Sequence, residues 1–432
     1  MKYSYYNIIK PYGKDYVLYN TLTEKFMFIS CELYHLFFYK EISIRTIREK
    51  HPNLYDDLET LGFIVDNRLD EPKQYIDRLK HNGDIETCEN YNLIINPTLD
   101  CNLRCWYCYE NLKKGSTINK NIIKGVEAFI QNLIHKPNIK LFTLSFFGGE
   151  PLLRFKKVIL PLITKASDLC RKKEVAFNVH FTTNAILLTP AIIESICANQ
   201  INLSVQVPFD GNEYFHNKTK TSNIKLGSYK RTINNVLYGI SKGISFIIRC
   251  NCTLENIDSF RELVNEFSEI QDKNYVVFSI QIIWQEEKSQ ILRQKEKELY
   301  DYVFEKGFNK FKSSIPPVKC YADNCNSLVI NYDGNVYKCT ANDFSPHNRE
   351  GVIDEEGKIC FNEKYKERID TMYHISCCTQ CKLFPICDVC TQHKLKTIHN
   401  AGDFSKCSTQ QMEEILNKRL HSLINSYENS IL

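Results

Sequence analysis

The sequence of 432 residues lacks a long hydrophobic run, a secretion signal and an excess of charge of either sign. No uninterrupted apolar stretch approaches the ~20 residues that a membrane-spanning helix needs. The N-terminal stretch has neither a continuous apolar core nor a small-residue cleavage site, which excludes a secretory signal. The 55 basic and 51 acidic residues leave a net charge of +4, too even to indicate a nucleic-acid partner. We therefore expect a cytoplasmic protein with no membrane and no nucleic-acid partner.

The chain also lacks the composition of a disordered or fibrous protein. Hydrophobic residues make up 43% of the sequence and aromatic residues 12%, and we find no short-period repeat or low-complexity tract. At ~150 residues per domain, this length predicts two to four domains with well-buried cores.

Cysteine, in contrast, is abundant. Ten of the 19 cysteines lie between Cys320 and Cys407, and three more lie within Cys101–Cys108. A secreted disulfide scaffold is typically short and carries a signal peptide, and this chain fits neither description. In a reducing compartment, clustered thiols more often bind metal or take part in chemistry, so we expect metal sites rather than disulfides.

Three regions of the chain differ in their patterning. The first, residues 1–88, mixes short strands with helices and ends in a charged, partly helical linker. Its predicted elements are strands at 15–19, 25–29 and 62–65, helices at 32–50 and 53–61, and the linker at 67–86. The Pro316-Pro317 pair marks a second boundary, after which a cysteine-rich segment ends in a predicted helix at 409–426.

Between these boundaries, apolar strands alternate with amphipathic helices. We predict strands at 91–96, 141–147, 176–182, 202–207, 245–251 and 276–283, with helices such as 122–134, 155–169 and 257–269 between them. Six β/α repeats imply an α/β fold with a parallel sheet, either doubly wound or curled into a partial barrel. In both arrangements, functional residues lie at the C-terminal ends of the strands.

Three cysteines follow the first of these strands. Cys101, Cys105 and Cys108 are separated by three and two residues, so the thiols of one loop can each reach a different iron of a 4Fe–4S cubane. The fourth iron would then have no protein ligand and would be open to substrate. A structural zinc site normally has four ligands, and no fourth Cys or His lies nearby in the sequence.

This spacing, with Tyr107 before the last cysteine, resembles that of the radical S-adenosylmethionine (SAM) enzymes. A second motif agrees: Gly148-Gly149-Glu150-Pro151 follows the second strand, and in that family this segment receives the amino group of SAM. Glycines allow close approach of the backbone, and a carboxylate or carbonyl accepts from an ammonium. The resemblance implies a partial (β/α)6 barrel, a SAM-cleaving 4Fe–4S cluster on the three cysteines, and an electron donor such as flavodoxin or ferredoxin.

Two further motifs depart from the family pattern. Many relatives carry Ser-x-Asp-Gly after the fourth strand and then His-x3-Arg, whereas this chain has Pro208-Phe-Asp-Gly and His216-x3-Lys220. Lys220 remains a candidate contact for the SAM carboxylate, as a point charge without the bidentate geometry of arginine. Arg249 on the fifth strand is a further candidate for SAM, with an ordinary surface or structural arginine as the alternative.

The C-terminal cysteines resemble those of a SPASM domain, which follows the barrel in many peptide-modifying radical SAM enzymes. A predicted hairpin at 329–339, with Asp333-Gly334 at its turn, fits that domain. In relatives with two auxiliary 4Fe–4S clusters, the ligands interleave. The resemblance therefore assigns one cluster to Cys320, Cys325, Cys339 and Cys390, and the other to Cys378, Cys381, Cys387 and Cys407.

Alternatives exist for these thiols. The last Cys pair is spaced x2 where relatives often show x3, and Cys377, beside Cys378, is a candidate substitute ligand. Cys-x2-Cys motifs serve structural zinc equally well, which would make the chain a zinc-stabilised peptide-binding scaffold. The remaining cysteines match no ligand spacing and are expected to act as buried apolar residues: Cys31, Cys88, Cys170, Cys197, Cys250, Cys252 and Cys360.

The choice between reactions depends on a few positions. Sulfatase-maturating relatives use an aspartate directly after the hairpin cysteine as general base, and this chain has Thr340 there. A hydroxyl cannot take a proton at neutral pH as a carboxylate can, although Asp343 lies three residues on. Tyr109, after the third cysteine of the first loop, does match those relatives.

These motifs predict three domains: a peptide-recognition-like module at 1–88, a radical SAM partial barrel at 89–314 and a SPASM domain at 315–432. The N-terminal module would bind the leader of a precursor peptide as an added strand, or else would cap the barrel. The predicted activity is reductive cleavage of SAM to a 5′-deoxyadenosyl radical, which abstracts hydrogen from a ribosomally made peptide to form a thioether or carbon–carbon crosslink. Formylglycine formation is the alternative.

Overall fold

The computed structural model describes residues 1–39, 42–82, 88–199, 201–221, 227–287, 289–309, 319–402, 404 and 407–431. These residues form two compact units. The terminal unit comprises Met1–Asp84, Ser313–Asn324 and Lys366–Leu432, and the sheet unit comprises Ile85–Lys312 and Cys325–Tyr365. The predicted boundary at Pro316-Pro317 lies outside the described residues.

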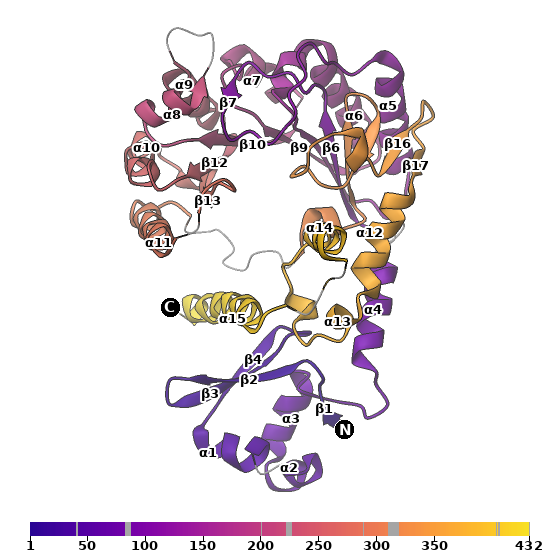
Figure 1. The fold of residues 1–432 in the computed structure, drawn as a ribbon, viewed down its shortest axis with the longest axis vertical. Helices are drawn as coiled ribbons and strands as arrows, with labels where there is room; N and C mark the ends of the chain where they lie inside the picture. Colours follow the sequence, from indigo (N-terminus) through magenta and orange to yellow (C-terminus); the bar gives the residue numbers. More distant parts are fainter. Residues whose placement is uncertain are drawn as a thin grey trace. The chain divides into compact units, whose positions relative to one another are not determined.

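The sheet unit is built on the six predicted strands, all of which are confirmed (Figure 1). They are β6 (Asn90–Asn96), β8 (Leu141–Phe146), β9 (Ala176–Thr182), β10 (Asn202–Phe209), β12 (Ser245–Cys252) and β13 (Val276–Ile282). These strands pair in parallel in their order along the chain. Such an order is that of a barrel wall, whereas a doubly wound sheet reverses its order at a switch point. The prediction of an α/β partial barrel is therefore confirmed.

Helices connect the strands and bury their apolar faces against the sheet. They include α5 (Lys120–Ile134), α6 (Leu160–Lys172), α7 (Pro190–Cys197), α8 (Glu213–Thr219), α9 (Tyr229–Ser241), α10 (Phe260–Glu266) and α11 (Gln290–Glu305). In α5, Asn119 caps the first turn by accepting from the Ile122 N–H at 3.0 Å. Val126, Ile130 and Leu133 then lie on one buried face, because their spacing follows the helical period.

Further strands extend this sheet beyond β6. β14 (Ser327–Asn331) pairs in parallel with β6, and β15 (Asn335–Tyr337), β16 (Gly351–Ile353) and β17 (Ile359–Phe361) follow in antiparallel order. The predicted hairpin is confirmed as β14–β15, and Gly334 in its turn has a φ of +79°, which glycine adopts without strain. The pairing of Ser327 with Asn92 was not predicted, because no local pattern connects residues so distant in the sequence.

In the terminal unit, β2 (Asn7–Tyr12), β3 (Asp15–Asn20) and β4 (Lys25–Ile29) form an antiparallel sheet, and β1 (Lys2–Tyr3) pairs with β5 (Ile64–Val65). Successive side chains of β3 pack on opposite sides. Leu18 packs in the core that α2 (Ile44–Lys50) and α3 (Pro52–Thr60) complete, whereas Val17 and Tyr19 pack with Leu416 and Leu420 of α15 (Thr409–Ile431). The first and last segments of the chain therefore share a core.

The helix predicted over 32–50 is wrong as a single element. The chain forms α1 (Cys31–Leu33), a π-helical segment at Tyr34–Tyr39 and then α2. Ser43 begins α2 by accepting from the Thr46 N–H at 3.2 Å, and such a cap starts a new helix. Other helices are α4 (Glu71–Asn82) within the predicted linker, α12 (Glu363–His374), α13 (Ser376–Thr379) and α14 (Thr391–Ala401). Among the described helices, none is long and apolar enough to cross a membrane.

The packing of α5 generates a test of the core. Ile130→Ala removes a side chain that is 2% exposed, and we expect the free energy of unfolding to fall by ~2–5 kcal/mol. Ile291→Ala makes the same change at a side chain that is 63% exposed, and we expect a change within ~0.5 kcal/mol. Chemical denaturation of both variants measures the difference. Equal losses would contradict the placement of α5 against the sheet.

Candidate active site

The first cysteine loop lies at the C-terminal end of β6. Cys101 and Cys105 are partly buried and Cys108 is exposed. Within the loop, β7 (Arg104–Cys105) pairs in antiparallel fashion with β11 (Lys220–Thr221), which places Lys220 opposite Cys105. The Cys108 N–H donates to the Cys105 carbonyl at 3.1 Å. All three thiols thus belong to one short loop at the C-terminal end of β6.

The Gly148–Glu150 segment, at the end of β8, packs directly on this loop. The Glu150 N–H donates to the Asp100 carbonyl at 2.8 Å. A Cβ at Gly148 would lie 2.5 Å from the Thr98 carbonyl oxygen, and one at Gly149 would lie 2.3 Å from the Asp100 carbonyl oxygen. Only glycine fits at such distances. The two glycines therefore have a structural role in holding the cysteine loop as well as the predicted role in SAM contact.

The Glu150 side chain is completely buried. Its carboxylate accepts from the Thr183 hydroxyl at 2.7 Å, from the Asn184 N–H at 2.9 Å and from the Leu152 N–H at 3.0 Å. Burial raises the pKa of Glu150 to about 7, against these hydrogen bonds, which lower it. Because Thr183 follows β9, the carboxylate ties the end of β8 to the end of β9. Pro151 continues this buried segment.

A buried ion pair supports the other side of the loop. The Lys220 ammonium lies 3.1 Å from an oxygen of Asp210, and the two side chains are 2% and 1% exposed. Lys220 also donates to the Tyr107 hydroxyl at 3.4 Å, and Asn251 donates to the same hydroxyl at 3.0 Å. Burial alone would lower the pKa of Lys220, but Asp210, Tyr107 and Cys105 together hold it well above its usual value. Lys220 therefore carries a positive charge beside Cys105.

Lys220 and Arg249, which the sequence offered as SAM contacts, both have protein partners. Lys220 pairs with Asp210, as described above. Arg249, in β12, donates from Nε to the Asn251 amide oxygen at 3.0 Å and is partly buried. Pro208 lies opposite Arg249 in the paired strands β10 and β12. The two cations thus belong to one hydrogen-bonded network that ends at Tyr107.

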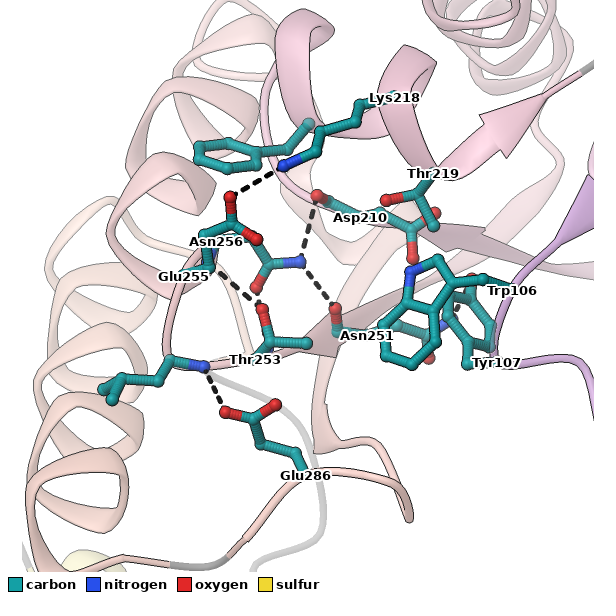
Figure 2. Close-up of a pocket in the computed structure, with 12 residues that line it drawn as sticks. Trp106, Tyr107, Asp210, Lys218, Thr219, Asn251, Thr253, Glu255, Asn256 and Glu286 are labelled. Carbon is teal, nitrogen blue, oxygen red and sulfur yellow. Dashed lines mark hydrogen bonds and ion pairs between the residues drawn. The ribbon is translucent and has the colours of Figure 1, made fainter.

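A pocket of about 550 Å³ opens beside this network at the ends of β10 and β12 (Figure 2). Its walls include Asp210 and Tyr107, and the rings of Trp106 and Tyr107 lie 5.6 Å apart. The other lining residues are Phe215, Lys218, Thr219, Asn251, Thr253, Leu254, Glu255, Asn256 and Glu286. Sequence reasoning missed Asn251, although a polar residue in an otherwise apolar strand signals a buried partner.

Exposed aromatic side chains surround the cysteine loop. Trp106 and Trp284 are each 62% exposed, and Tyr109 is 38% exposed. The rings of Tyr109 and Trp284 lie 5.1 Å apart, which brings the loop after β13 to the third cysteine. Sequence analysis singled out Tyr109 but neither tryptophan. Large exposed apolar groups gathered on one surface are typical of binding surfaces.

The C-terminal cysteines are divided between the units. In the terminal unit, burial raises the pKa of Cys378 to about 12, and Cys377 and Cys387 add to this effect. Burial is the largest cause that raises the pKa of Cys407, and Cys381 and Cys377 raise it further. Cys320, Cys387 and Cys390 line a cavity of about 30 Å³ in the same unit. Cys325 and Cys339 belong to the sheet unit. Across the described ranges, no three His, Cys, Asp or Glu side chains are grouped so as to hold a single metal ion.

The residues of this site lie in a part of the chain that is similar to known proteins. Residues 95–267 match the family described as the Radical SAM superfamily. The chain is similar to the uncharacterized protein MJ0907 of Methanocaldococcus jannaschii, with 26% identity over 272 residues, 57% of this chain and 84% of that protein. It is also similar to the radical SAM cyclopropyl synthase TigE of Paramaledivibacter caminithermalis, with 27% identity over 241 residues, 51% of this chain and 48% of TigE.

A solved structure shares the fold. Native anSMEcpe with bound AdoMet and the Cp18Cys peptide aligns with a TM-score of 0.59 and 19% identity, over 79% of this chain and 99% of that chain. The cysteine loop, the Gly148–Glu150 segment and the Asp210–Lys220 pair all lie within the matched stretch. Residues 95–267 therefore match the Radical SAM family model, and the chain shares the radical SAM fold.

Proposed function

We propose that this protein is a radical SAM peptide maturase that forms a thioether or carbon–carbon crosslink in a ribosomally made precursor. The observation that carries the proposal is the cysteine loop packed on Gly148–Glu150 at the end of β6. Cys101, Cys105 and Cys108 would hold the SAM-cleaving cluster. The C-terminal cysteines would hold two auxiliary clusters in the ligand sets that the sequence suggested.

The residues of the loop fit a 4Fe–4S cluster. Thiolates are the usual ligands of such clusters. Burial is the main cause that raises the pKa of Cys101 to about 12, and Glu150 is the next. Cys105 and Cys108 add smaller contributions, so the three thiols lie within electrostatic range of one another. A cluster held there would supply the electron that breaks the carbon–sulfur bond of SAM, with methionine as the other product. The Gly148–Pro151 segment would hold SAM beside it.

The surrounding residues position the loop. Lys220 places a fixed positive charge beside Cys105, and this charge opposes the rise in the pKa of Cys105 that burial causes. Asn251 and Lys220 both hold the Tyr107 hydroxyl, which fixes the backbone between Cys105 and Cys108. The pocket of about 550 Å³ has the size of a small-molecule site and lies beside that backbone.

A peptide substrate is favoured by the exposed aromatic side chains around the cysteine loop. Trp106, Tyr109 and Trp284 offer large contact areas of the kind that anchor peptide partners. The sheet β2–β3–β4 has two edge strands, and a leader peptide would add to one of them as a further strand. The peptide named with anSMEcpe supports the same substrate class for this fold. An electron donor such as flavodoxin or ferredoxin would reduce the clusters.

Asp343 does not favour the sulfatase-maturating alternative. Its carboxylate accepts from the Ser345 N–H at 3.2 Å and from the Asn348 amide at 2.6 Å. Hydrogen bonds from Ser345 and then Asn348 lower the pKa of Asp343, which makes it a weaker base. We therefore expect a sulfatase-derived Cys peptide to remain unchanged in mass spectrometry, while formylglycine in that peptide would support the alternative.

The proposed cluster site is tested by replacing Cys101, Cys105 and Cys108 together by Ala. We expect 5′-deoxyadenosine formation to be abolished, because no ligand of the SAM-cleaving cluster remains. Iron on the C-terminal cysteines should be retained. Chromatography of the nucleoside after anaerobic reconstitution and reduction is the measurement, with Cys360→Ala, an exposed thiol, as the matched control. SAM cleavage by the triple variant would refute the assignment.

The Asp210–Lys220 pair gives a separate prediction about stability. Lys220→Met leaves the buried Asp210 carboxylate without its cation, and we expect the free energy of unfolding to fall by ~3–5 kcal/mol. The Asp210→Asn/Lys220→Met double variant should recover much of this loss, because neither charge remains. Lys218→Met, which breaks an exposed pair with Glu255, should change stability by at most ~1 kcal/mol. Denaturant unfolding compares the three, and no recovery in the double variant would contradict the pairing.

A further inference from the structure

The neighbouring strands β9 and β10 have one apolar face and one polar face. Val179, Phe181 and Val205 on the apolar face are completely buried in the core that the helices complete (Figure 1). Successive side chains of a strand alternate between its two faces. The other face, called the polar face below, therefore carries Asn178, His180, Thr182, Asn202, Ser204 and Gln206. Parallel strands that are covered on both faces are typically apolar throughout. The polar face is thus suited to contact with water or with a polar ligand.

Two side chains of the polar face, near the C-terminal ends of the strands, are available to a ligand. Thr182 lies opposite Gln206 in the paired strands β9 and β10, and both residues are partly exposed. Within the described part of the chain, neither the Thr182 hydroxyl nor the Gln206 carboxamide has a hydrogen-bond partner. A hydroxyl and a carboxamide together offer donors and acceptors without charge. This pair therefore suits an uncharged ligand that brings both kinds of group.

A histidine that lies two residues before Thr182 adds a third polar group to this face. His180 lies opposite Ser204, and its Nδ1 lies 2.8 Å from the Ser204 hydroxyl oxygen. Burial lowers the pKa of His180 to about 4, so its imidazole is neutral at pH 7. Among the described residues its Nε2 has no hydrogen-bond partner, and this atom is not fully buried. Nε2 therefore offers one uncharged hydrogen-bonding group on the polar face.

The Thr182–Gln206 pair adjoins the residues that support the cysteine loop. Thr183, the next residue, donates from its hydroxyl to the buried Glu150 carboxylate, and its N–H donates to the Gln206 carbonyl at 3.1 Å. The Glu150 N–H in turn donates to Asp100 of the cysteine loop. β9 and β10 place no Asp, Glu, Lys or Arg side chain on the polar face. A ligand held on this face would therefore lie next to the proposed SAM-cleaving site, in uncharged surroundings.

We propose that Thr182, Gln206 and His180 bind an uncharged segment of the peptide substrate and hold one of its backbone peptide groups. A peptide group has one donor, one acceptor and no charge, which matches a hydroxyl, a carboxamide and a neutral imidazole. An acidic or basic side chain would lose its hydration on this face without gaining an opposite charge. The inference rests on the proposed function, which names a peptide substrate but gives it no contact on β9 or β10.

The first test measures the reaction of His180 with diethyl pyrocarbonate, which acylates accessible, unprotonated imidazole nitrogens. In the anaerobically reconstituted full chain, we expect peptide mass spectrometry to show modified His180, whereas His216, which is 0% exposed, should resist. A blocked peptide of alternating Gly and Ser, at millimolar concentration, should slow the modification of His180 several-fold. A blocked peptide of alternating Gly and Asp should leave the rate unchanged. An unreactive His180, or equal rates with the two peptides, would overturn the inference.

A second test assigns this protection to a side chain. Gln206→Met keeps the size of the side chain but removes its hydrogen bonds, so half-maximal protection of His180 should require about fivefold more Gly-Ser peptide. Gln294→Met makes the same change at an exposed position of α11 and should leave this requirement as in the wild type. Equal requirements in the two variants would overturn the role of Gln206.

A third measurement separates the peptide from the cofactor. SAM added without peptide should leave the modification rate of His180 unchanged, and protection by SAM alone would assign these residues to SAM and overturn the inference. The failure of the proposed function is distinguishable from this outcome. A wild-type chain that cleaves no SAM, but whose His180 the Gly-Ser peptide still protects, would overturn the proposed function and support the peptide site.

Discussion

The carboxylate of Glu150 accepts hydrogen bonds from Leu152, which follows β8, and from Thr183 and Asn184, which follow β9. The backbone N–H of Glu150 donates to the Asp100 carbonyl in the cysteine loop. Three neighbouring strand ends are thereby held together around one buried group. The two glycines before it allow the loop backbone to approach to distances that a Cβ would forbid. The position of the three thiols depends on this contact, because the loop has little regular structure of its own beyond β7.

A second buried charge completes the support from the opposite side. Lys220 reaches the loop through strand pairing with Cys105, through Tyr107 and through its ion pair with Asp210. A buried ion pair contributes little net stability, but it is costly to break. Such a pair is therefore suited to holding the cysteine loop in a single conformation. The adjoining pocket shares Tyr107 and Asp210 with this support, so the same residues position the loop and shape the space beside it.

Much of this fold could be predicted, because local patterns carry the information. The six parallel strands each have an apolar run bounded by turn residues, and Asp333-Gly334 marks its hairpin by composition alone. The addition of β14 to β6 could not be predicted, since parallel pairing joins distant segments without a local signal. The partners of Lys220 were hidden for the same reason: Asp210 and Tyr107 come from different connections, and the sequence suggested SAM as the partner.

The central claim is that the cysteine loop holds a cluster with one iron open to SAM. Electron paramagnetic resonance of the dithionite-reduced protein, recorded with and without SAM, tests this most directly. The account predicts a 4Fe–4S signal that changes when SAM is added, because SAM would bind the iron that has no protein ligand. A cluster signal that SAM leaves unchanged, or a reduced protein with no cluster signal at all, would contradict it.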